Sequence, residues 1–94
     1  MSLFDVGVVR TTPSAALMLE GSPDSADWEG FELLKRHTSG DWGEVSAGNA
    51  RENDLSVREG FRVFSAYTTR NGHKVWVITH ADRESTNILS AEEY

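Results

Sequence analysis

The sequence contains no cysteine and only two prolines among its 94 residues. Without cysteine, the chain has no disulfide, no thiol nucleophile and no thiolate ligand for a metal ion. No apolar run approaches the roughly 18 residues that a membrane-spanning helix needs. The first residues also lack the basic segment and apolar block of a signal peptide. These absences predict a cytoplasmic protein with no membrane contact.

Basic residues are scarce, because nine Lys and Arg stand against fifteen Asp and Glu, for a net charge of -6. The excess acid lies in residues 20–59, with ten acids and four bases, whereas residues 61–80 hold three bases and no acid. Proteins that bind duplex nucleic acid usually present a strongly basic face. Direct binding of duplex DNA is therefore not expected, although the basic strip leaves contact with a short RNA open.

Motifs for metals and cofactors are absent as well. The three histidines lack the spacing of metal ligands, and the chain has no phosphate loop, dinucleotide fingerprint or Ser-nucleophile motif. Neither a metal ion nor a cofactor is expected.

The helical signals lie in the first two thirds of the chain. Thr12 followed by Pro13 is typical of a helix start, because Thr caps the free N–H groups and Pro suits the first helical position. This pattern predicts a helix over residues 13–20. A second helix is expected to end at His37, and a short third helix is expected over residues 49–58.

The last third of the chain changes to strand signals. Residues 61–69 and 74–79 are rich in aromatic and β-branched side chains, and they flank Asn71-Gly72. Asn-Gly indicates a hairpin with a type I′ turn. A third run over residues 86–89 completes a predicted antiparallel meander.

We therefore predict a single α+β domain over residues 1–94, with two to three short helices packed on a three-stranded antiparallel meander. Residues 6–9 predict either an additional N-terminal strand or an extended arm. In the middle strand, Val75 and Val77 alternate with Trp76 and Ile78, so both faces of the sheet carry apolar side chains. The helices should cover one face. A partner, the N-terminal segment or a second copy should cover the other.

The segment 37–43 concentrates the residue types that carry chemistry. His37 can act as a general acid or base, and Asp41 can orient it. Arg83 can stabilise a phosphate or an oxyanion, and Thr86 can donate a hydrogen bond. These four residues form the candidate catalytic set of a small ribonuclease-like phosphoryl-transfer enzyme or toxin. In the structural alternative these residues have no catalytic role. His37 then caps the end of the second helix, Asp41 forms an Asx turn, and Arg83 pairs with Asp82 or Glu84 on the surface.

The same segment also supports a binding function. The glycines around Asp41-Trp42 indicate a fixed turn, which presents the indole either as an exposed anchor or as part of the core. The candidate protein-binding residues are Asp24, Asp27, Asp41, Trp42, Glu44 and Arg83.

Several segments together carry a resemblance to a known family. They are residues 36–44, 50–53, 58–67, 76–79, 81–83, 86 and 92–94, and the helix start at Thr12. Over nearly its whole length the chain resembles short bacterial proteins called "plasmid-related proteins", which occur on plasmids, phages and integrated elements. The pattern departs from the family at His80, Asn87 and residues 90–91. The resemblance implies a mobile-element setting in bacteria and no established activity.

The small size, the acidic half and the lack of a convincing catalytic set predict a protein-binding inhibitor or accessory protein. Its expected partner is a host or element-encoded protein complex, such as a CRISPR or restriction nuclease that it counters. The expected state is a monomer or a homodimer. The enzyme described above and a regulatory homodimer remain the alternatives.

Overall fold

The computed structural model describes residues 2–22 and 24–94 and confirms an α+β fold. The helices are α1 (Pro13–Met18), α2 (Glu29–Thr38) and α3 (Ala47–Glu59), followed near the C-terminus by the short 3₁₀ helix η1 (Ala91–Glu93). The strands are β1 (Val8–Thr11), β2 (Val63–Thr68), β3 (Lys74–Thr79) and β4 (Ser85–Ser90).

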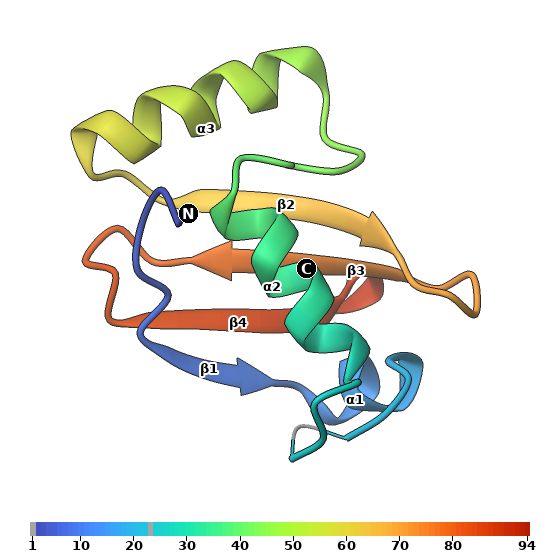
Figure 1. Ribbon diagram of the computed structural model, residues 1–94. Helices are drawn as coiled ribbons and strands as arrows, with labels where there is room; N and C mark the ends of the chain where they lie inside the picture. Colours follow the sequence, from blue (N-terminus) through green and yellow to red (C-terminus); the bar gives the residue numbers. More distant parts are fainter. Residues whose placement is uncertain (1, 23) are drawn as a thin grey trace.

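The strands form one mixed sheet in the order β1-β4-β3-β2 (Figure 1). The expected antiparallel meander is present as β2, β3 and β4, in which Val77 pairs with both Ser65 and Ile88. The possible additional N-terminal strand is present as well, because β1 adds to β4 in parallel, with Val9 opposite Thr86. Residues 8–11 are therefore a strand and not a free arm.

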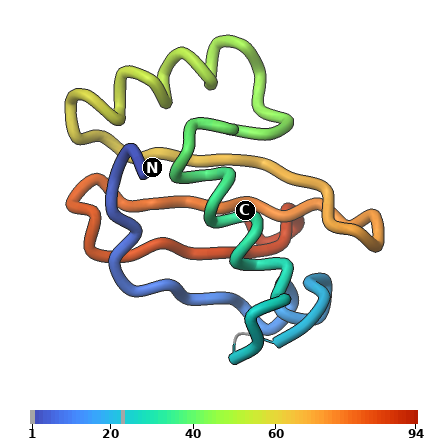
Figure 2. Tube along the Cα trace, viewed as in Figure 1, coloured from blue at the N-terminus to red at the C-terminus, as the bar shows by residue number. Residues whose placement is uncertain are grey.

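The hydrophobic core lies on the face of the sheet that α1 and α2 cover. Figure 2 shows α2 crossing this face, while α3 lies along the β2 side of the sheet. The buried cluster consists of Ala15, Leu19, Trp28, Leu33, Tyr67, Val75, Val77 and Ile88. Side chains alternate across a strand, so Trp76 and its neighbours in the same row must point to the opposite face.

The helix start predicted at Thr12 is confirmed, and α3, expected from residue 49, begins two residues earlier behind a cap of the same kind. The Thr12 hydroxyl accepts a hydrogen bond from the Ala15 N–H at 3.2 Å, and Pro13 occupies the first turn of α1. The Ser46 hydroxyl caps α3 by accepting from the Asn49 N–H at 3.1 Å.

The β2–β3 hairpin is confirmed, but its turn is not type I′. Among the described residues of this turn only Gly72 has a positive φ, at 85°, whereas type I′ requires two such residues. The Gly72 N–H instead donates to the Thr69 carbonyl at 2.9 Å. This matches the longer hairpin in which a turn is followed by one left-handed glycine.

Candidate functional site

His37 lies near the C-terminal end of α2, between this helix and the sheet, and has no solvent exposure. Its Nδ1 is 2.6 Å from the Ser65 hydroxyl, and its Nε2 is 2.9 Å from the Thr79 hydroxyl. Thr79 contacts the Thr86 hydroxyl at 2.7 Å, and Thr86 donates to the Val6 carbonyl. Both ring nitrogens are thus used within the fold, so the imidazole ties α2 to β2 and β3.

Burial is the main cause that lowers the pKa of His37 from its ordinary 6.5 to about 3, and the positive charge of Arg83 acts in the same direction. The imidazole is therefore neutral at neutral pH. A general base must also reach the proton that it abstracts. This His has no solvent-accessible surface, so it does not meet that requirement.

Arg83 occupies the turn between β3 and β4, with a φ of 62°. Its guanidinium donates to the carbonyls of Phe61 at 2.7 Å and Ser56 at 2.8 Å. It also lies 5.3 Å from the centre of the Phe4 ring, which contacts His37 edge-on. Arg83 therefore joins the β3–β4 turn to the C-terminal end of α3. The structural alternative had expected it to pair with Asp82 or Glu84, and among the described residues neither ion pair is present.

Replacing Arg83 by Met should destabilise the fold. The change leaves the Ser56 and Phe61 carbonyls without this donor, which we expect to cost about 1.5–3 kcal/mol, the range for hydrogen bonds to a charged group. The matched variant Arg51→Met lies on the exposed side of α3 and should cost less than about 0.5 kcal/mol. Urea unfolding of both variants checks this, and equal midpoints would contradict the assignment.

Asp41 is held by local contacts. It pairs with Arg36 at 2.7 Å, and its carboxylate accepts from the Gly43 N–H at 3.2 Å. The Arg36 hydrogen bond is the main cause that lowers the pKa of Asp41. The Tyr67 hydroxyl donates to the Asp41 carbonyl at 2.6 Å. The turn is therefore fixed, as its glycines predicted, but its carboxylate does not orient His37.

Trp42 is not an exposed anchor. Only 7% of its surface is exposed, its ring stacks against Phe4, and its indole N–H donates to Asp54 at 3.2 Å. The core alternative is thus the one observed. The physical reason is that the turn folds back along β2, which carries the indole under α3.

The other predicted binding residues do not gather into one surface. Asp24 and Asp27 lie between α1 and α2, and Asp27 accepts from Ser25. Glu44 lies beside β2, where it pairs with Lys74 at 2.5 Å. In Figure 1 these segments and the β3–β4 turn that holds Arg83 occupy three separate corners of the molecule.

The sheet face opposite α1 and α2 carries aromatic rings and an arginine. Phe64 and Trp76 lie with their ring centres 5.2 Å apart, and Tyr94 stacks on the other side of Trp76 at 5.1 Å. The Arg62 guanidinium lies 5.8 Å from the Phe64 ring. We call Phe64, Trp76 and Tyr94 the aromatic row, and this whole surface the open face.

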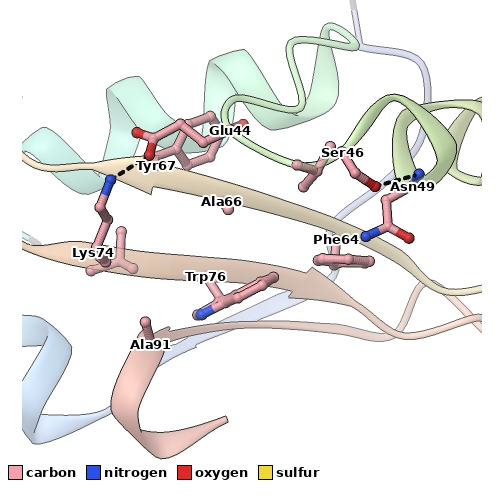
Figure 3. A pocket seen from close by; sticks show the side chains of 11 residues that line it. Glu44, Ser46, Asn49, Phe64, Ala66, Tyr67, Lys74, Trp76 and Ala91 are labelled. Carbon is pink, nitrogen blue, oxygen red and sulfur yellow. Dashed lines mark hydrogen bonds and ion pairs between the residues drawn. The ribbon is translucent and has the colours of Figure 1, made fainter.

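Two hollows flank the aromatic row. The first, of about 280 Å³, lies between the row and the chain entering α3, and the Glu44–Lys74 pair closes its rim (Figure 3). The second, of about 580 Å³, lies over β1, β4 and β3. Its lining is Arg10, Thr11, Thr12, Arg62, Ile78, His80, Asn87, Leu89 and Tyr94, with two arginines and no acid. Glu93 precedes the lining residue Tyr94, and its carboxylate accepts from the hydroxyl of Thr12, another lining residue, and from the backbone N–H of Ser90.

The Val75–Ile78 alternation predicted the apolar character of this face but not which other residues surround it. Arg10, the neighbours Arg62 and Phe64, and Tyr94 come from three separate parts of the chain, and the fold brings them together. The one available signal was the basic strip of residues 61–80, to which Arg62 belongs.

No protein-family model, curated protein or solved structure matches the chain. Within residues 2–22 and 24–94 no three His, Asp or Glu side chains are grouped to hold a metal ion. No helix in this described part has the length and apolar character of a membrane span.

Proposed function

We propose that this chain is a binding protein that docks its open face onto another protein. The observation that carries the proposal is the composition of that face, which has aromatic rings and arginines on an uncovered sheet and no acid lining its larger hollow. Protein interfaces are enriched in aromatic residues and Arg and depleted in Asp, Glu and Lys. The arginines favour a partner with acidic groups around an apolar centre.

The geometry favours a protein partner over a nucleic acid. Trp76 stacks on Tyr94 and is tilted by 31° to Phe64, so its neighbours on both sides leave less of its ring face free to stack on a base. The net charge of -6 also opposes a polyanion. The enzyme alternative has no supporting observation, because His37 is buried and Asp41 and Arg83 are held elsewhere by their own partners.

The proposed setting follows from the resemblance to plasmid-related proteins. We propose a bacterial, cytoplasmic, mobile-element protein whose partner belongs to a host defence complex, such as a CRISPR or restriction nuclease. In this proposal the protein covers an acidic and apolar surface of that complex and thereby lowers its activity.

Charge reversal at Arg62 tests this proposal. Arg62→Glu removes one of the two arginines of the larger hollow, and an acid facing acidic groups of the partner should cost several kcal/mol of binding free energy. The readout is the transformation efficiency of a plasmid targeted by a restriction or CRISPR system, in cells that produce the protein. Wild-type protein should protect the plasmid, and Arg62→Glu should lose at least about tenfold of that protection.

The matched control is Arg51→Glu, which makes the same charge change on the exposed side of α3. It should protect as wild type does. Equal loss in both variants would point to bulk charge rather than the open face, and absence of protection by the wild type would overturn the inhibitor role. Light scattering distinguishes docking on a partner from self-pairing, because a homodimer that Arg62→Glu dissociates would indicate a second copy.

A further inference from the structure

The two edge strands of the sheet, β2 and β1, differ in whether their outward backbone groups are hydrogen-bonded. Along β2 these groups have partners. The Ala66 N–H donates to the Trp42 carbonyl at 3.1 Å, and the Ala66 carbonyl accepts from the Glu44 N–H at 2.7 Å. Two residues earlier in β2, the Asn53 side-chain amide makes both hydrogen bonds of the Phe64 backbone, at 2.6 Å and 3.1 Å. Covering an edge in this way prevents another strand from pairing with it.

The β1 edge is open within the described residues. The N–H groups of Val8 and Thr12 donate to the carbonyls of Glu84 and Ile88. In a parallel pair, alternate residues of one strand make the bonds, so the backbone groups of Val9 and Thr11 point away from β4. No residue in ranges 2–22 and 24–94 pairs with them from that side. This edge therefore offers free donors and acceptors to an added strand.

A hollow lies beside β1 on each face of the sheet, and Thr11 lines both of them. On the helix side lies a hollow of about 390 Å³ whose lining is mainly apolar. Its lining is Val9, Thr11, Ala16, Trp28, Phe31 and Leu34, of which Phe31 is 42% exposed. On the open face lies the larger hollow with Arg10 and Arg62 and no acid in its lining.

We propose that the partner docks by adding an extended segment to the free edge of β1, with alternating apolar and acidic side chains. This proposal rests on the proposed function and specifies how the partner reaches the open face. Successive side chains of a strand point to opposite faces. The apolar ones would enter the hollow beside Phe31, and the acidic ones would meet Arg10 and Arg62. Backbone hydrogen bonds supply affinity and the alternating pockets supply specificity in this mode of recognition.

A second copy of the chain is a poorer occupant of this edge. Its own β1 has Val8 and Arg10 on the open face and no acid. Pairing two copies would therefore bring a second Arg10 to a hollow that already has two arginines. Like charges across a strand pair are destabilising. The charge of the site thus selects a different protein with acidic side chains.

A random decapeptide library displayed on phage, selected against the whole protein, tests the proposal. Enriched peptides should alternate apolar and acidic residues. Thr11→Pro removes an outward N–H and leaves the β4 bonds intact, because Pro is tolerated on an edge strand where its N–H would face solvent. The matched Thr11→Ala removes only the side chain. Because Thr11→Ala keeps the N–H, selected peptides should bind Thr11→Pro at least about tenfold more weakly than they bind Thr11→Ala.

A second readout uses the unchanged protein, so it does not depend on whether Thr11→Pro folds. Bound peptide should slow hydrogen exchange of the Val9 and Thr11 amides. Enrichment of no peptide, peptides without the alternation, or unchanged exchange at these amides would overturn strand addition. If the Arg62→Glu effect on plasmid protection holds while Thr11→Pro leaves protection unchanged, the proposed function stands and this inference fails.

Discussion

Acidification from pH 7 to pH 4.5 is expected to lower the free energy of unfolding by about 2–3 kcal/mol through His37 alone. The imidazole has its pKa lowered to about 3 in the folded protein, against 6.5 in its ordinary state. At pH 4.5 the unfolded chain binds a proton at this position and the folded protein does not. Stability therefore falls as the pH drops below about 6.5, and the loss levels off below about pH 3 at about 4–5 kcal/mol.

The matched variant is His37→Gln, which cannot titrate. Its shorter hydrogen-bonding reach should cost about 1–3 kcal/mol at pH 7, where one of the bonds to Ser65 and Thr79 is lost. The difference between wild type and variant should shrink on acidification, because only the wild type has the His37 proton to bind. Asp41, Glu44 and Glu93, whose pKa values are lowered, act at more acidic pH and are common to both proteins.

Urea unfolding at several pH values between 7 and 4.5 measures this difference. A wild-type profile that parallels that of His37→Gln would mean that the imidazole titrates normally in the folded protein. In that case His37 would be accessible to solvent and could again be the general base of the enzyme alternative.

The second large effect concerns Gly43, which should not tolerate even a methyl group. Gly43 has a φ of 72° and pairs with Ala66, where an added Cβ would lie 2.0 Å from the Ala66 carbonyl oxygen and 2.7 Å from the Tyr67 ring. These neighbours are a strand backbone and a buried ring, so neither can move away cheaply. Gly43→Ala should cost about 3 kcal/mol or more, from overpacking combined with left-handed strain.

Gly72 provides the control, since it has a similar φ of 85° and nothing within 4 Å of an added Cβ. Gly72→Ala should cost only about 1–2 kcal/mol, the strain of a left-handed residue without a clash. Thermal or urea unfolding of the two variants separates the cost of the clash at Gly43 from the left-handed strain that both variants share. Equal destabilisation would mean that the segment around Gly43 is not held against β2 as described.

The local part of the fold was predictable because short-range chemistry determines it. Thr12-Pro13 and Ser46 mark helix starts by capping N–H groups three residues away. The change to alternating side chains after residue 60 similarly predicts the strands. Asn71-Gly72 predicts a hairpin, but the turn type depends on how the two strands align, so the I′ prediction was wrong.

The long-range part was not predictable from one sequence. Val8–Thr11 pairs with β4 across more than seventy residues, and no local signal distinguishes such a strand from an extended arm. His37 and Trp42 are residue types equally suited to a site or to a core. Their burial depends on partners such as Ser65, Thr79 and Asp54, which lie 12 to 42 residues away in the chain.

For the candidate site, the sequence predicted only that one apolar face of the sheet needs to be covered. Alternation in β3 requires something to cover Trp76, but it does not say that Tyr94 and Phe64 flank that ring. The arginines that give the open face its charge come from β1 and from the residue before β2, so their convergence is a property of the sheet.

Plasmid protection by His37→Gln and Arg62→Glu, compared side by side with both proteins verified as folded, tests the central claim most directly. If His37 belongs to the scaffold and Arg62 to the binding surface, His37→Gln should protect the targeted plasmid as the wild type does, while Arg62→Glu should lose at least about tenfold of that protection. Loss of protection with His37→Gln and retention with Arg62→Glu would contradict both assignments.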